Sequence, residues 1–340
     1  MHRLIARLLP LSVVTILLAI SCAGAQKSAG PGSRTMMDAH NCYPYYEWWN
    51  DRIDRALTAA AGTPLAIEQD LGWFTDPRTG ASRSVVTHAE PPTGHEPTME
   101  QYFFARVRPI VEKALQDGNH GDWPLITLNL DFKDNKPEHI AAVLALLRNH
   151  QSWLTSAVKG TAIETVQPLD VKPILVLTGE ADAQQAVFYD ELSESDRVLA
   201  FGAIHTAVKN PHAQPEIIDD QKASNYRRWW NNPWSVVEDG GQTKAGEWTA
   251  EKMNRLRALV ERAHNNGLWI RFYTLDGATE QELSCHGWFR SYNFGSLEAA
   301  RIRWRAAIAA HVDYIASDQY ELLAGEVAHD GTTASVQKSQ

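Results

Sequence analysis

The sequence predicts an α/β fold, a (β/α)8 barrel of the TIM type formed by a single domain. The chain has 340 residues, of which 44% are hydrophobic, and this is enough apolar material for a sizeable core. Short apolar runs alternate with longer helical patterns, as expected for parallel strand-helix units. No long linker rich in Gly, Pro or Ser divides residues 36–328. A doubly wound open sheet is the alternative, because it has the same alternation.

The predicted strands are eight short apolar runs, at 36–40, 64–70, 84–88, 125–133, 173–178, 198–203, 268–274 and 312–318. Between them, helical periodicity is clear at 99–116, 137–154, 250–265 and 297–311. Eight such runs alternating with helices in a chain of this size favour the closed barrel.

The N-terminus has the features of an export signal in residues 1–25. Arg3 and Arg7 precede an apolar run at 8–20, whose 13 residues are fewer than the roughly 20 that span a bilayer. Cleavage is expected either after residues 23–25, Ala-Gly-Ala, or before Cys22, where residues 19–22 resemble a bacterial lipobox. We therefore expect a periplasmic or extracellular protein that is soluble or anchored through a lipidated Cys22. Residues 26–35 are expected to be a flexible tether, and 329–340 a disordered tail.

The charge and the cysteines limit the partners and the compartment. The net charge is −9, and the chain has no basic block, so we expect no binding to nucleic acid. Export would place Cys42 and Cys285 in an oxidising compartment, where a disulfide and two free buried thiols are both open. We expect a monomer.

Two predicted strands end in acidic residues on the face that would point into the barrel. Side chains alternate along a strand, so in 125–133 the inward set includes Asp131 and Lys133. In 64–70, Glu68 and Asp70 share the inward face at the carboxyl end, where barrel enzymes place their chemistry.

These carboxylates are candidate metal ligands. Like charges at i and i+2 in one pocket need a cation, and Glu68, Asp70 and Asp131 would form an all-oxygen site suited to Mg²⁺ or Ca²⁺. The alternative is a set of salt bridges to Arg or Lys at the barrel mouth.

Two histidines end other predicted strands. His40 follows the run that begins at residue 36, and His88 ends the run at 84–88. Histidine exchanges protons near neutral pH, so a pair across a pocket can supply a general acid and a general base. Lys133 would add a positive charge to the same wall.

In this order, His40, Glu68-x-Asp70, His88 and Asp131-x-Lys133 resemble the phospholipase C-like phosphodiesterases, which include glycerophosphodiester phosphodiesterases and sphingomyelinase D. The intervals are also similar, with 28 residues from His40 to Glu68 and 18 from Asp70 to His88. The resemblance extends to 269–274 and 312–318, which look like the seventh and the closing strand of that family.

The resemblance implies cleavage of a lipid or small-molecule phosphodiester. His40 and His88 would be the acid and the base, in an undecided order, and Glu68, Asp70 and Asp131 would hold one divalent cation, Mg²⁺ or Ca²⁺. Lys133 would neutralise phosphate charge. The attacking group would be water or a neighbouring hydroxyl of the substrate, which gives a cyclic phosphate.

The chain also departs from these relatives. His40-Asn41-Cys42 replaces the usual His-Arg-Gly of glycerophosphodiesterases, and Asp131-x-Lys133 is closer to sphingomyelinase D. The substrate therefore stays open, and Asn41 becomes a candidate substrate-binding residue.

Further candidates lie on the later strands. Arg271 and Tyr273 share an inward face, so Arg271 could clamp a phosphate or form a salt bridge, and Tyr273 could line the pocket. Asp318 could orient Lys133 or a histidine, or cap a helix. The Trp-rich segment 225–234 is predicted to be a connection that forms either a lid over the site or a cover packed on the barrel.

Two other functions are compatible with a Trp-rich exported barrel. A glycoside hydrolase would use two strand-end carboxylates, here Asp131 and Asp276. That reading leaves both histidines and Glu68 without a role. A non-catalytic barrel lipoprotein is the second alternative.

Overall fold

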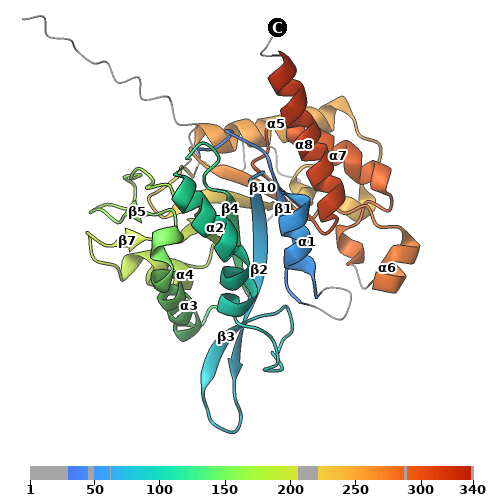
Figure 1. Cartoon of the computed structure of the whole chain (residues 1–340). Helices are drawn as coiled ribbons and strands as arrows, with labels where there is room; N and C mark the ends of the chain where they lie inside the picture. Colours follow the sequence, from blue (N-terminus) through green and yellow to red (C-terminus); the bar gives the residue numbers. More distant parts are fainter. Residues whose placement is uncertain are drawn as a thin grey trace, which may run out of the picture.

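The computed structural model of the chain describes residues 30–44, 50–61, 63–118, 120–205, 221–286 and 289–337, and of 285–286 and 330–337 it describes the backbone alone. Within these ranges the barrel has eight parallel strands (Figure 1), namely β1 (Met36–Ala39), β2 (Leu65–Thr75), β4 (Ile126–Phe132), β6 (Ile174–Thr178), β8 (Phe201–Ala203), β9 (Arg227–Pro233), β10 (Trp269–Tyr273) and β11 (Tyr314–Ser317). The first strand pairs with both β2 and β11, so the sheet closes on itself. This closure confirms the predicted barrel and excludes the open sheet.

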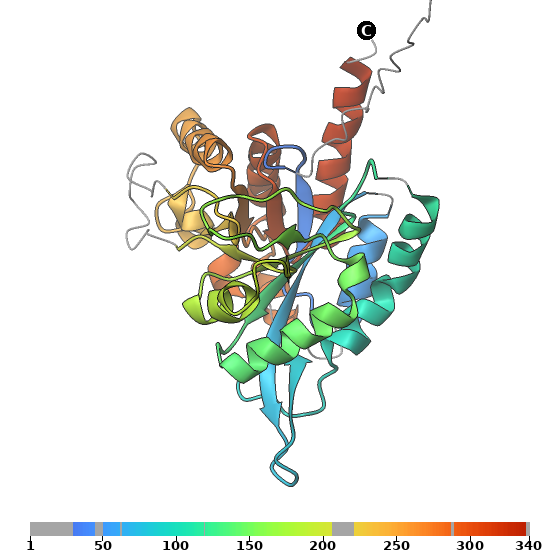
Figure 2. The same ribbon diagram turned by 90° about the vertical axis from the view of Figure 1, so that its left-hand side faces the viewer.

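Helices cover the outside of the barrel (Figure 2). They are α1 (Arg52–Ala59), α2 (Ala105–Asp117), α3 (Pro137–Asn149), α4 (Asp182–Gln185), α5 (Ala250–Asn265), α6 (Glu280–His286), α7 (Leu297–Ala309) and α8 (Tyr320–Gln337). A small separate sheet pairs β5 (Ala157–Val158) with β7 (Arg197–Val198). Apolar strand residues such as Ile67, Leu128 and Ile270 are fully buried in the core. The predicted helical ranges correspond to α2, α3, α5 and α7.

One predicted barrel strand is instead part of a hairpin. The run 84–88 overlaps β3 (Ser82–Val86), which pairs antiparallel with the distal half of β2. The β2 strand is 11 residues long and continues past the barrel, and β3 folds back along this extension (Figure 1).

The missing barrel strand is β9, in the segment that was predicted to be a lid or cover. It pairs with β8 and β10. Trp229 and Trp230 are buried on its two faces, and Trp234 is buried just after it. The lid hypothesis is therefore wrong, because these side chains belong to the barrel and its core.

The segments expected to be a tether and a tail are described only in part. Residues 1–29, with the export signal and Cys22, lie outside the described residues. The end of the tether is packed on the barrel, where the Gly32 amide donates to Asp313 at 2.7 Å and Arg34 donates to the Trp123 carbonyl at 2.7 Å. Helix α8 continues through Gln337, into the range expected to be disordered. In the described part of the chain, no helix is both long and apolar enough to cross a membrane.

Candidate functional site

A polar cavity of about 250 Å³ lies at the carboxyl ends of the barrel strands. It is lined by His40, Glu68, Asn129, Leu130, Asp131, Gly179, Trp229, Asn231, Arg271, Tyr273 and Tyr292. Parallel strands of a closed barrel end at the same mouth, which is why residues far apart in the sequence meet here.

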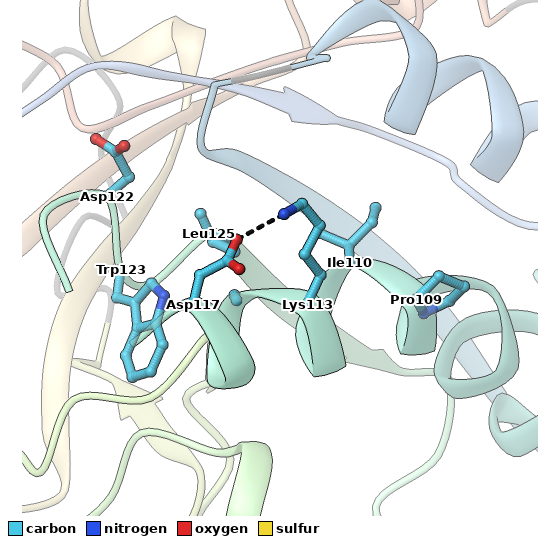
Figure 3. Close-up of a pocket in the computed structure, with 8 residues that line it drawn as sticks. Pro109, Ile110, Lys113, Asp117, Asp122, Trp123 and Leu125 are labelled. Carbon is cyan, nitrogen blue, oxygen red and sulfur yellow. Dashed lines mark hydrogen bonds and ion pairs between the residues drawn. The ribbon is translucent and has the colours of Figure 1, made fainter. Parts of the chain in front are cut away.

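A larger cavity, of about 470 Å³, lies elsewhere, between α2 and the residues that precede β4 (Figure 3). Its wall is mostly apolar and includes Ile110, Trp123 and Leu125, and its Asp117 is already paired with Lys113 at 2.6 Å. It adjoins the start of β4, whereas Asp131 lies near the other end of that strand. We therefore place the chemistry in the smaller cavity.

The three predicted metal ligands come together. Oxygens of Glu68, Asp70 and Asp131 all lie within 4.8 Å of one another, because Asp70 on β2 is the register partner of Asp131 on β4. Asp70 is 1% exposed, and neither of its oxygens accepts a hydrogen bond. Burial raises the pKa of Asp70 well above its usual range, against the attraction of Lys133. An all-carboxylate set with such an unsatisfied member fits a hard divalent cation.

Salt bridges, the predicted alternative, also occur in the cluster. Lys133 Nζ lies 3.1 Å from Asp70 and 2.7 Å from Asp131. Arg271 donates to Glu68 at 2.5 Å, to Asn231 at 3.1 Å, and through its Nε to Asp38. The guanidinium is thus held by the barrel wall, and the geometry supports the salt-bridge alternative for Arg271 over a phosphate clamp.

The salt bridges do not balance the charge of the cluster. It contains the carboxylates Asp38, Glu68, Asp70, Asp131 and Asp318 and the cations Arg52, Lys133 and Arg271. With every carboxylate ionised and His40 neutral, five negative and three positive charges leave a net −2. Buried excess charge is costly, so it is relieved either by protons or by a dication.

His40 is held by a buried carboxylate. His40 lines the cavity; its Nδ1 lies 3.0 Å from Asp318, and its Nε2 lies 3.7 Å from Glu68. Asp318 also accepts from Arg52 at 2.9 Å. Burial opposes a charge on the ring, but Glu68 and Asp318 outweigh it and raise the pKa of His40. Among the alternatives left open for Asp318, the structure supports the one in which Asp318 orients a histidine, here His40.

His88 lies after β3, is exposed and does not line the cavity. Its ring is 5.9 Å from the rings of both Tyr43 and Phe289. Phe289 contacts Tyr292 at 5.5 Å, and Tyr292 meets the edge of His40 at 5.7 Å. Aromatic rings therefore connect the two histidines. Desolvation and the nearby Lys133 lower the pKa of His88.

The remaining candidates divide into those that face the cavity and those that do not. Tyr273 lines it, as predicted. Asn41 does not, because its amide donates to Asp318 at 3.2 Å, so the structure gives no support to its predicted role in substrate binding. Asp276 is buried and accepts from Ser317 at 2.6 Å, and burial raises its pKa to about 7. Asp276 does not line the cavity with Asp131, so the glycoside hydrolase arrangement has no geometric support.

Asp38 and Arg52 are functional-site residues that sequence reasoning missed. Asp38 shares the face of β1 that leads to His40, a spacing of two that was readable from the sequence. Arg52 is a buried arginine in α1, and nothing in its helical pattern indicates its partner.

Cys42 is a fully buried free thiol, and burial raises its pKa to about 12. The side chain of Cys285 lies outside the described residues. The pairing of Cys42 with Cys285 therefore stays an open prediction.

No protein-family model and no curated protein matches the chain. Among solved structures, it is similar to a glycerophosphodiester phosphodiesterase from Parabacteroides distasonis (13% identity, 88% of this chain and 98% of that one, TM-score 0.46). It is also similar to a calcium-dependent phosphoinositol-specific phospholipase C from Pseudomonas sp. (14% identity, 88% of this chain and 93% of that one, TM-score 0.46). HPPK-DHPS from Plasmodium falciparum matches as well (8% identity, 89% of this chain and 49% of that one, TM-score 0.44). The chain, whose closed sheet makes it a (β/α)8 barrel, is similar in structure and at low identity to glycerophosphodiester phosphodiesterases and to a phospholipase C.

Proposed function

We propose that the protein is a metal-dependent phosphoric diester hydrolase that acts on a glycerophosphodiester or phospholipid-type substrate. One observation carries the proposal: His40, supported by Asp318 through its Nδ1, lines the same cavity as Glu68 and Asp131, two of the three clustered carboxylates. A histidine with one nitrogen fixed by a carboxylate presents the other for proton transfer.

In this proposal, Glu68, Asp70 and Asp131 hold one divalent cation, Mg²⁺ or Ca²⁺. When bound, the cation would polarise the phosphoryl oxygens of the substrate. His40 and His88 carry the two proton transfers, one from the attacking hydroxyl and one to the leaving oxygen. Lys133 supplies positive charge for the phosphate.

The test is a screen of the purified mature protein against a panel of phosphodiesters with Mg²⁺ or Ca²⁺ and with EDTA. Phosphorus NMR of the products would separate simple hydrolysis from formation of a cyclic phosphate. His40→Ala and His88→Ala should each abolish cleavage while the circular dichroism spectrum stays native. Turnover that survives in both variants would refute the assignment of His40 and His88 as the proton-transfer residues. Turnover that survives EDTA would refute the metal dependence of the reaction.

We also propose that the protein is exported as a monomer and that it is soluble or attached to a membrane through Cys22. The basic start, the apolar run at 8–20 and the lipobox-like residues 19–22 support export. Mass spectrometry of the mature N-terminus would distinguish a lipidated Cys22 from cleavage after residue 25. Light scattering after size exclusion would measure the mass of the particle.

A further inference from the structure

A buried histidine on the outer helix layer contacts both strands of the β2–β3 hairpin, which is followed directly by His88. His139 of α3 is 0% exposed, and its Nε2 lies 2.8 Å from Ser84 Oγ on β3. Its ring stacks on Trp73 of β2 at 5.1 Å. Trp73 and Ser84 are register partners across the hairpin. A single side chain of α3 therefore holds both strands at the same level.

The other ring nitrogen of His139 contacts the end of β4. Its Nδ1 lies 3.3 Å from Asp134, the residue that follows Lys133. Burial lowers the pKa of His139 and so favours the neutral ring, which has one donor and one acceptor nitrogen. An ionised carboxylate only accepts, so we assign the proton to Nδ1, and Nε2 then accepts from the Ser84 hydroxyl.

The chain of contacts from Ser84 through His139 to Asp134 has the order of a nucleophilic triad, but its surroundings do not suit one. A triad histidine must receive a leaving group beside its Nε2. His139 is enclosed, with Trp73 stacked on its ring and the ring of Phe132 edge-on at 5.0 Å. These contacts leave no approach for a leaving group, so they favour a supporting role.

The hairpin needs such a support because it projects beyond the barrel. The pairing of β2 with β4 ends at Leu71, whereas the pairing of β2 with β3 runs from Leu71 to Thr75. Past Leu71, the barrel sheet no longer sets the direction of the hairpin. β3 returns to the barrel at Val86, the register partner of Leu71, and the Thr87 amide donates to the Asp70 carbonyl at 2.9 Å. His88 follows directly, so it is placed by a short segment that is held both by the barrel and, four residues earlier at Ser84, by His139.

We propose that His139 is a positioning residue that fixes the hairpin against α3 and the end of β4, and thereby sets His88 relative to Lys133. The catalytic part of this inference rests on the proposed function, in which His88 transfers a proton. The positional part does not depend on activity and can be measured without a substrate.

The test compares two substitutions at His139 with a matched control on the same helix. His139→Phe keeps a ring but removes both hydrogen bonds, and His139→Gln restores one donor and one acceptor. The control is His150→Phe, because His150 caps the other end of α3, pairs with Glu100 at 2.6 Å and stacks on Phe104 at 4.0 Å. We expect His139→Phe to lower kcat by about 10- to 100-fold with KM and metal affinity unchanged. His139→Gln should recover most of the loss, and His150→Phe should leave kcat near the wild-type value.

A readout without substrate is the NMR signal of the His88 ring in protein labelled with ¹³C-histidine and assigned with His88→Gln. The signal should shift or broaden in His139→Phe and stay unchanged in His150→Phe. Ser84→Ala should cause the same change as His139→Phe, and it replaces that variant if His139→Phe does not fold. A wild-type enzyme with no phosphodiesterase activity would refute the proposed function, while this signal would still decide the positioning role. An unchanged His88 signal in both variants would overturn the inference, as would labelling of Ser84 by a fluorophosphonate.

Discussion

Asp70→Asn should separate the stability of the barrel from its capacity to bind a metal. Asp70 is buried without a hydrogen bond to either oxygen, and it forms an ion pair with Lys133 at 3.1 Å. Asn has nearly the same shape and no charge. The substitution therefore removes a carboxylate whose pKa is raised by burial, and with it one of three ligands. The metal-free variant should be at least as stable as the wild type, while its affinity for the cation should fall.

The size of the effect follows from linkage between binding and unfolding. At a metal concentration of 100 times Kd, the wild type gains about 2.7 kcal/mol of unfolding free energy. Loss of an outer-shell partner weakens metal sites by about 10- to 100-fold, so loss of a ligand should cost about 100-fold or more. At the same metal concentration the variant then gains about 0.4 kcal/mol. For a chain of this size, the shifts in Tm would be about 4 °C and under about 1 °C.

The assay is thermal unfolding followed by circular dichroism, in EDTA and in saturating Ca²⁺ or Mg²⁺. Asp117→Asn is the control, because the carboxylate of Asp117 belongs to an exposed pair on α2. A metal-induced shift of wild-type size in Asp70→Asn would refute the assignment of the ligands. A metal-free variant that melts well below the wild type would refute the argument from burial.

Three further predictions concern the buried charges. Arg271→Gln leaves two buried carboxylates without their partner, so it should lower the unfolding free energy measured in urea by about 3–5 kcal/mol. The control is Arg55→Gln, which breaks an exposed ion pair and should lower the unfolding free energy by under about 1 kcal/mol. Equal losses would contradict this. Asp318→Asn should lower kcat by about 100-fold or more and lower the pKa of His40 in an NMR titration, because Asp318 is, with Glu68, one of the two charges that stabilise the imidazolium. The pKa of His40 is raised in the folded state, so its contribution to stability is present below about pH 6.5 and is lost as the pH rises through the folded value. The stability difference between wild type and His40→Gln without metal should therefore shrink with rising pH, and a difference that grows would be the opposite of what we expect.

Much of the site could be predicted because it depends on two local rules. Alternation along a strand placed Glu68 and Asp70 on one face, and the parallel arrangement of strands brought Asp131 and Lys133 to the same end of the barrel. Neither rule depends on the details of packing. The same rules do not reveal which counter-charge a carboxylate acquires, so the partnership of Arg271 with Asp38 required the structure.

The errors in the strand assignment have a physical cause. The run 84–88 has the composition of a strand and is one, but its direction depends on the continuation of β2 past the barrel, which is a tertiary property. In β9, two adjacent tryptophans are buried on opposite faces, and Arg227 and Asn232 are buried beside them. A strand enclosed on both faces, with polar side chains inside the barrel, has no alternating pattern to recognise.

The geometry of the cations has a consequence for the order of events in the proposed reaction. Arg271 donates hydrogen bonds to three protein acceptors, and Lys133 forms ion pairs with both Asp70 and Asp131. Neither is available to a phosphate while the acidic cluster depends on it. A dication bound by the carboxylates would take over this neutralisation and release Lys133 toward the substrate. Metal should therefore bind before the phosphodiester, and the KM for substrate should fall as the metal concentration rises toward saturation, whereas a KM independent of metal would show that Lys133 does not couple the two.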